Sequence, residues 1–183
     1  MIAGPSGVGK GSVVKELRSR DPEGSALSIS ATTRAPRAGE VQGRDYFFVT
    51  GQEFQQMISA GALLEWADVF DHRYGTPKDY VESHLRDGTD VLLEIDVVGA
   101  GEVRRVHPDA LLILLAPPSM DELGRRLRGR GTESEERIQR RLAKAAWELD
   151  QASWFDQVVV NDDLVHASSQ VAAIIDASRH QRS

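Results

Sequence analysis

The sequence contains no cysteine. Its 183 residues therefore include no disulfide, no thiolate nucleophile and no cysteine ligand for zinc. It also lacks any run of about 18 apolar residues, and no charged stretch followed by a long apolar segment opens the chain, so we expect neither a membrane-spanning helix nor a signal peptide. These absences favour a cytoplasmic protein with no membrane partner.

Positive charge is scarce overall. The chain has 22 Lys and Arg residues against 28 Asp and Glu residues, which gives a net charge of −6. A surface that follows the phosphates of a nucleic acid usually needs an excess of basic residues, so we predict no nucleic-acid partner. Any phosphate chemistry must therefore depend on local groups of arginines.

Apolar strand-like segments alternate with helix-like segments along most of the chain. The segments of strand type are residues 26–30, 91–96, 110–118 and 157–161. This alternation predicts an α/β fold of parallel β-α-β units, with helices on both faces of one sheet. The strand-like segments within residues 31–88 are shorter and more polar, so we expect a mixed α/β insertion there. Residues 1–30 and 89–183 are expected to form the core that carries it.

Within the insertion, local signals predict two helices. Thr50 followed by Glu53 is a capping-box pattern for a helix over 51–61. Pro77 near the start and Gly88 at the end predict a second helix. The segments 46–49 and 63–70 are expected to be extended, and the segment 30–45, rich in Thr, Gly, Pro and Arg, is expected to be a loop.

The chain opens on a glycine-rich turn. Gly4, Gly9 and Lys10 match the G-x-x-x-x-G-K spacing, and a helical pattern follows at once, which predicts a phosphate-binding loop. Gly11 stands where such loops usually have a Ser or Thr that binds Mg²⁺. We therefore expect Ser12 to bond a donor phosphate and Mg²⁺ to be held by donor phosphates and waters. This G-K-G-S sequence resembles the loop of adenylate kinases and indicates a nucleotide kinase.

Eight motifs occur in order along the chain. They are "GPSGVGK", "SATTRAPRAGEVQGRDYFFV", "LLEWADV", "YGTP", "LEID", "APPS", "LRGRGTES" and "VVVNDDL". In this order the chain resembles guanylate kinases from end to end. The resemblance implies a P-loop parallel-sheet core, a GMP-binding insertion, a lid near residues 127–140, and transfer of the γ-phosphoryl group of ATP to GMP and dGMP with Mg²⁺. The family's first strand is several residues long, whereas three residues precede the loop here, so we expect an upstream start to complete it.

The resemblance also implies which residues hold the donor. Lys10 and the lid arginines Arg126, Arg130 and Arg141 are expected to neutralise charge on the transferring group. The ATP-binding set implied is Gly4, Pro5, Ser6, Gly7, Val8, Gly9, Lys10, Gly11, Ser12, Asn161 and Asp162. Asp96 ends a core strand, where the ligand crevice of an open α/β sheet lies, so we expect it to organise waters of Mg²⁺.

The acceptor residues follow from the same resemblance. Arg34, Arg37, Tyr46 and Tyr74 are expected to hold the GMP phosphate, since a guanidinium fork suits a two-pronged grip on a phosphate dianion. Glu65 is expected to accept from the two adjacent donors of guanine. Ser30, Thr76 and Glu94 complete the implied set, with the Thr76 hydroxyl donating to guanine O6.

Several alternatives stay open at this point. Glu94 is alternatively a buried structural carboxylate, and Asn161 with Asp162 alternatively caps the last helix. The whole chain is alternatively a non-enzymatic guanylate-kinase-like interaction module, or a kinase for another small phosphorylated acceptor. Lys10, Ser12 and the arginines stand in place, which favours the enzyme. Oligomeric state is not indicated.

Overall fold

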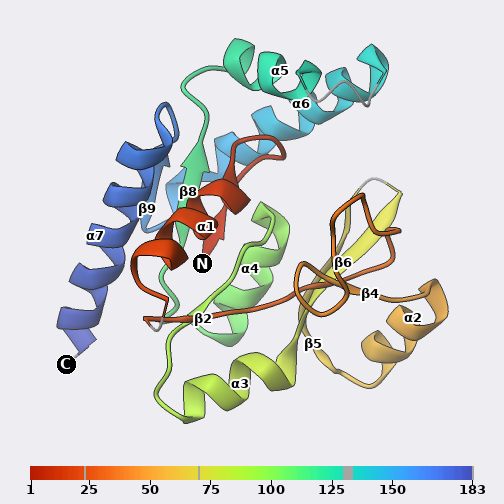
Figure 1. The fold of residues 1–183 in the computed structure, drawn as a ribbon, viewed down its shortest axis with the longest axis vertical. Coiled ribbons are helices and arrows are strands. Elements are labelled where there is room, and N and C mark those ends of the chain that lie inside the picture. The colour runs from red at the N-terminus through yellow and green to blue at the C-terminus, as the bar shows by residue number, and fades with distance from the viewer. Residues whose placement is uncertain (23, 70, 130–133, 183) are drawn as a thin grey trace. The chain divides into compact units, whose positions relative to one another are not determined.

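The computed structural model of the protein describes residues 1–22, 24–69, 71–129 and 134–182. Its elements belong to two compact units, each made of separate stretches of the chain (Figure 1). The first unit comprises Met1–Glu23, Glu94–Ala100 and Asp109–Ser183, and the second comprises Gly24–Leu93 and Gly101–Pro108.

The first unit is built on a parallel sheet. Strands β1 (Ile2–Ala3), β8 (Ile113–Ala116) and β9 (Gln157–Val160) pair in the order β1-β8-β9. Ile2 lies opposite Ile113, and both residues are buried. These strands are apolar at successive positions because both of their faces are covered. The carboxyl end of β1 leads directly into the glycine-rich turn.

Several helices of the first unit follow these strands along the chain. They are α1 (Lys10–Arg20), α5 (Met120–Arg128), α6 (Glu135–Asp150), the 3-10 turn η1 (Gln151–Trp154) and α7 (Leu164–Arg182). Helix α7 packs against α1, and Arg20 donates to the Ser169 hydroxyl between them. Helices α5 and α6 pack on each other through Leu123, Leu127 and Ile138. Helix α4 (Val97–Val106) begins in the first unit and ends in the second.

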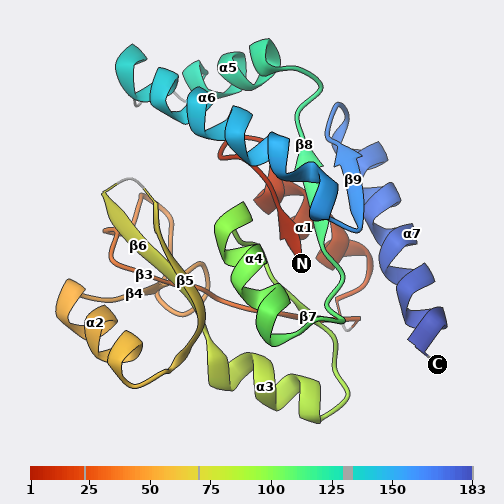
Figure 2. The ribbon, with the colours of Figure 1, turned by 180° about the vertical axis from the view of Figure 1, so that it is seen from behind.

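The second unit contains two sheets. Strands β2 (Ala26–Leu27) and β7 (Val91–Leu92) form a parallel pair. The larger sheet has the order β4-β3-β6-β5 (Figure 2). Its strands are β3 (Ala31–Thr32), β4 (Phe47–Phe48), β5 (Leu63–Val69) and β6 (His72–Pro77). Strand β6 runs antiparallel to both of its neighbours, so β5 and β6 form a long hairpin.

Two helices complete the second unit. In α2 (Gly51–Ser59), the Thr50 hydroxyl accepts from the backbone N–H of Glu53, and the Glu53 carboxylate accepts from that of Thr50. The predicted capping box is confirmed. Helix α3 (Lys78–Arg86) starts after Pro77, and Gly88 follows its end with φ of 76°.

The predicted α/β fold class is confirmed, and the predicted helices are present. The strands differ more. The segment 30–45 was expected to be a loop but contains β3, and β6 lies in a stretch for which no strand was expected. Both strands are held by pairing with distant partners, which a local pattern does not contain. Across the described ranges, every helix is too short or too polar to cross a bilayer.

Candidate functional site

The glycine-rich turn joins β1 to α1 and has three glycines with a positive φ, Gly4, Gly7 and Gly9. Gly4 has φ of 144°, and a Cβ there would lie 2.3 Å from the carbonyl oxygen of Leu115. Gly9 has φ of 102° at the N-cap of α1, and a Cβ there would lie 2.5 Å from Nδ2 of Asn161. The turn therefore presses against β8 and against the end of β9, and its backbone leads into a helix N-terminus, where N–H groups lack helical partners.

The Lys10 ammonium folds back over this turn. Its Nζ donates to the carbonyl oxygens of Gly4 at 2.6 Å and Pro5 at 3.3 Å. Burial lowers the pKa of Lys10, and the carboxylates of Glu94 and Glu148 oppose that shift. The lysine thus brings one positive charge to the loop and stabilises the shape of its backbone.

Asn161 and Arg126 hold the other side of the turn. Nδ2 of Asn161 donates to the Val8 carbonyl at 2.7 Å, and Arg126 donates to the carbonyls of Asn161 at 3.0 Å and Val8 at 3.4 Å. The interpretation of Asn161 and Asp162 as the cap of the last helix is wrong, because the Asp163 carboxylate accepts the N–H of His166 at the start of α7. Asn161 is instead a buried brace of the loop.

Gly11 lies beside a carboxylate. A Cβ at position 11 would lie 3.5 Å from Oε2 of Glu94, so the place of the usual hydroxyl residue adjoins an acidic group. Burial raises the pKa of Glu94, and the charge of Lys10 opposes that shift. Ser12 is exposed on the first turn of α1.

Asp96 is held from two sides. Its Oδ1 accepts the N–H of Gly99 at 2.8 Å, at the start of α4, and its Oδ2 lies 3.2 Å from Nζ of Lys144. Lys144 also lies 3.6 Å from the buried carboxylate of Glu148, one turn further along α6. Burial raises the pKa of Glu148, and Lys144 opposes that shift. Sequence reasoning missed Lys144 and Glu148, although their i, i+4 spacing on a helix was a usable signal.

The described part of the chain contains no group of three or more His, Cys, Asp or Glu side chains placed to hold a metal ion. A single Asp96 carboxylate near the loop fits Mg²⁺, which keeps several waters and is bound by one or two carboxylates together with substrate phosphates. It does not fit a metal enclosed by protein ligands alone.

Of the two other arginines predicted for the lid, only Arg141 lies within the described residues. Arg141 is partly buried on α6. Arg130 lies outside the described residues, as does part of the segment 127–140 that the sequence predicts as a lid. Arg128 and Glu135, on the two helices that flank this segment, form an ion pair with a shortest distance of 2.6 Å.

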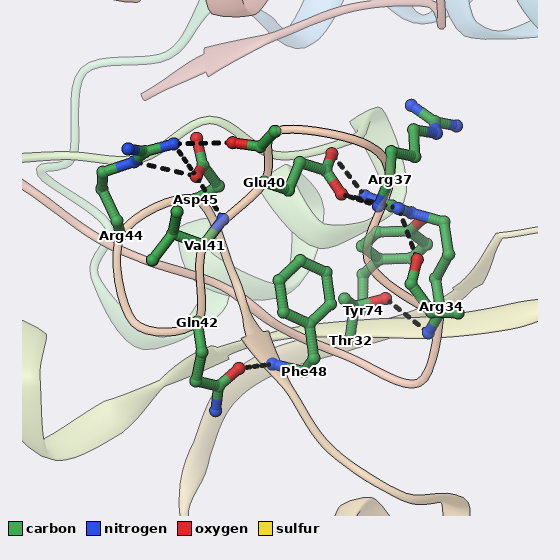
Figure 3. A network of polar contacts seen from close by, with 12 residues as sticks. Thr32, Arg34, Arg37, Glu40, Val41, Gln42, Arg44, Asp45, Phe48 and Tyr74 are labelled. Atoms are coloured by element: carbon green, nitrogen blue, oxygen red, sulfur yellow. Dashed lines mark hydrogen bonds and ion pairs between the residues drawn. The ribbon is translucent and has the colours of Figure 1, made fainter.

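In the second unit, three of the predicted acceptor residues come together, Arg34, Tyr46 and Tyr74. Figure 3 shows Arg34 beside Tyr74. Nε of Arg34 donates to the Tyr74 hydroxyl at 3.2 Å, and its guanidinium carbon lies 5.3 Å from the centroid of the Tyr46 ring. The Tyr46 and Tyr74 rings contact edge to face at 6.0 Å. Arg37 is exposed on the adjoining loop, and its guanidinium makes no hydrogen bond within the described ranges.

A further residue of this cluster was not predicted. The Glu40 carboxylate accepts from Nη1 and Nη2 of Arg34, both at 2.9 Å, and from the backbone N–H of Arg37 at 2.7 Å. The fork of Arg34, expected to face a phosphate, is therefore occupied by a carboxylate of its own loop. The signal available was an acidic residue six positions after one arginine and three after the next.

Glu65 and Thr76 form a buried pair in the β5–β6 hairpin. The two residues lie opposite each other in the strand register, and their side chains are 6% and 0% exposed. The Thr76 hydroxyl donates to Oε1 of Glu65 at 2.5 Å. Gly75 allows close packing here, since a Cβ would lie 3.0 Å from the Glu65 carbonyl oxygen. A hydroxyl has one hydrogen to donate, so Thr76 could reach guanine O6 only by giving up this bond.

Comparison with known proteins gives one consistent result. The model of the guanylate kinase family matches residues 1–178. The chain is 55% identical over 171 residues to the guanylate kinase of Synechococcus sp. (strain CC9902), covering 93% of this chain and 91% of that protein. It is 50% identical over 179 residues to that of Caldanaerobacter subterraneus subsp. tengcongensis, covering 98% and 86%.

A solved structure agrees with these sequence relatives. The crystal structure of guanylate kinase from Anaplasma phagocytophilum superposes with a TM-score of 0.78 at 32% identity. The match covers 96% of this chain and 82% of that one. The similarity therefore extends over both units and is not confined to the phosphate loop.

Proposed function

Since this chain belongs to the guanylate kinase family, whose members transfer a phosphoryl group from ATP to GMP, we propose that its two units divide the nucleotides between them. The first unit holds ATP on the loop of residues 4–12. The insertion of residues 31–88 supplies most of the residues for GMP. The family relationship already excludes the interaction-module reading, because the relatives at 50% identity and above are themselves named guanylate kinases.

The donor side works by charge and position. Lys10 and the N–H groups at the start of α1 stabilise the negative charge of the β- and γ-phosphates. Arg126, already bonded to the loop carbonyl of Val8, brings a second positive charge to the same place. Ser12 bonds a phosphate, and Arg141 adds a further charge from α6.

Mg²⁺ is part of this proposal. It would supply positive charge that neutralises the donor phosphates. Asp96 would hold it through water, oriented by Gly99 and Lys144. This arrangement explains how Gly11 replaces a hydroxyl residue without loss of the metal, because the donor phosphates and waters supply the other ligands.

On the acceptor side, one observation carries the assignment. Glu65 is a carboxylate buried to 6% exposure and oriented by a hydroxyl on the facing strand. Guanine presents N1–H and the 2-amino group side by side, and a carboxylate accepts both, whereas adenine presents a bare acceptor at N1. The phosphate is held by Arg34, Arg37, Tyr46 and Tyr74, and Ser30 lies beside the base.

None of these residues is assigned to the sugar, so we propose that dGMP is also a substrate. The test is a coupled assay of ADP release with GMP, dGMP, AMP and UMP at matched concentrations. We expect turnover with GMP and dGMP and about 10⁴-fold lower kcat/KM with AMP. Equal use of AMP and GMP would refute the proposed role of Glu65.

A further inference from the structure

Arg34 has nearly all of its hydrogen-bond donors in use. A guanidinium carries five N–H groups. In Arg34, Nε donates to Tyr74, Nη1 donates to both the Ala35 carbonyl at 2.7 Å and Glu40, and Nη2 donates to Glu40. Four of the five are therefore committed within the second unit, and one N–H on Nη2 remains for an anion.

The Glu40 carboxylate is held as firmly as the guanidinium. It accepts two bonds from Arg34 and one from the backbone of Arg37, and the backbone N–H of Glu40 donates to the Arg37 carbonyl at 3.1 Å. The side chains of Arg34 and Glu40 are 10% and 20% exposed. These bonds raise the pKa of Arg34 and lower that of Glu40, so both groups stay charged.

Two outcomes are possible when a phosphate dianion reaches Arg34. The anion could displace Glu40 from the guanidinium, or Glu40 could stay and leave the anion one N–H. Displacement would break two charge-assisted hydrogen bonds between Glu40 and Arg34. It would also leave a carboxylate, tied to the turn by its own backbone, beside a second negative group. Retention keeps both bonds of the pair and still leaves one N–H of Nη2 for the anion, so neither negative group loses its partner.

We propose that Glu40 is a positioning residue for the acceptor phosphate, which holds the Arg34 guanidinium in one orientation and reserves the two-pronged grip on that phosphate for Arg37. The inference rests on the proposed role of Arg34 and Arg37 as phosphate ligands. Glu40 itself does not touch the nucleotide. It fixes where the positive charge of Arg34 stands before the acceptor arrives.

The geometry around the pair supports this role. Phe48 and Tyr46 lie against the guanidinium, with ring centroids 5.7 Å and 5.3 Å from its central carbon. The guanidinium therefore has aromatic rings beside it, Glu40 on its Nη edge and Tyr74 at Nε (Figure 3). Arg37, by contrast, contributes only its backbone N–H and carbonyl to this network, and its guanidinium stays available.

The experiment is a double-mutant cycle in steady-state kinetics with the whole protein. The parent, Glu40→Gln, Arg34→Met and the double variant are compared for kcat, KM for GMP and KM for ATP. We expect Glu40→Gln to raise KM for GMP about tenfold, with kcat and KM for ATP within about twofold of the parent. In the Arg34→Met background, the same change at position 40 should have no further effect.

Asp45→Asn is the matched control. Asp45 is a carboxylate of the same loop, bonded to the Val41 N–H at 2.8 Å and paired with Arg44, and it does not contact Arg34. Its replacement should leave KM for GMP within about twofold of the parent. Circular dichroism and thermal unfolding check each variant, and Glu40→Asp replaces Glu40→Gln if the latter is unfolded. That shorter carboxylate should raise KM for GMP as well, since it cannot keep both bonds to Arg34.

Each other result is decisive. Tighter GMP binding by Glu40→Gln would show that the carboxylate competes with the phosphate, and would overturn the inference. A penalty that persists without Arg34, or one reproduced by Asp45→Asn, would assign the effect to loop structure and overturn it too. If Arg34→Met left KM for GMP unchanged, the phosphate-ligand role itself would fall, and the inference with it; that result is distinct from the first three.

Discussion

Replacement of Glu65 is the sharpest test of how this protein selects its acceptor. Glu65 is buried and therefore poorly solvated, so the bonds that we propose it makes to guanine would not be weakened by competing water. Each charge-assisted bond contributes about 1.5–3 kcal/mol, so the two that guanine can make together contribute about 3–6 kcal/mol. Glu65→Ala removes both, and kcat/KM for GMP should fall by about 10²- to 10⁴-fold.

Glu65→Gln probes the same site more finely. The Thr76 hydroxyl donates to Oε1, so the amide oxygen of a glutamine would be drawn to that position and the NH₂ group would face the donors of guanine. We expect a loss for GMP of about 10- to 10²-fold and a smaller or absent loss for AMP, so the GMP preference shrinks.

The assay is coupled ADP release at varied GMP and AMP, with fixed saturating ATP. Glu53→Gln is a suitable control, because Glu53 is an exposed carboxylate whose partner is the cap of α2. The reasoning is refuted if Glu65→Ala retains kcat/KM for GMP within about threefold of the parent while the unfolding midpoint is unchanged.

Four further predictions follow from the described contacts. Lys10→Ala should abolish transfer in the ADP assay, and activity within about tenfold of the parent would contradict the loop assignment. Ser12→Ala should slow transfer while the Mg²⁺ dependence of the rate is retained; a sharp shift in that dependence would instead make the hydroxyl a metal ligand. Gly4→Ala should lower the free energy of unfolding in urea by at least about 2 kcal/mol, because its Cβ meets a backbone oxygen, whereas Gly88→Ala, with open space around it, should lose less. Glu40→Gln should unfold at a lower temperature than the parent at pH 7, and the two melting curves should converge as the pH falls below 4.5. The pKa of Glu40 is lowered in the folded protein, so the stabilisation by its carboxylate is present above pH 4.5 and is lost as the carboxylate is protonated. Curves equally separated at acid pH would argue against the ion pair.

Local signals predicted the helices well. The capping box of Thr50 and Glu53, and the glycines that follow α2 and α3, act within a few residues, so a window of the sequence contains their whole cause. The phosphate loop is similar, because the spacing of Gly4, Gly9 and Lys10 specifies both backbone conformation and chemistry.

Strands were harder to predict because their partners are remote in sequence. The apolar segment 26–30 was expected to be one strand, yet only Ala26 and Leu27 pair, with Val91 and Leu92. Strand β6 contains a glycine and a proline and has weak intrinsic preference for extended structure, but it is stabilised by β5 on one side and β3 on the other.

Site residues divide in the same way. The resemblance to guanylate kinases indicated Arg34, Arg37 and Glu65 as acceptor residues, and that assignment stays a prediction. The sequence did not reveal which acceptor each hydrogen-bond donor would find. In the structure, Arg34 donates to Glu40, Asn161 donates to the Val8 carbonyl, and Lys144 donates to Asp96. Those outcomes depend on side-chain directions fixed by the folded backbone.

The interleaving of the two units along the chain has a consequence for synthesis on the ribosome. The second unit is complete in the nascent chain once Pro108 has been added, before any residue of β8 exists. The phosphate loop precedes the second unit in the chain, but β1 pairs with β8 and α1 packs on α7, so the loop lacks these two neighbours until α7 is made. At about 5–20 residues per second, that delay is on the order of ten seconds. We expect the second unit to fold first, while the segment that we propose to bind ATP stays open and protease-sensitive until α7 is made.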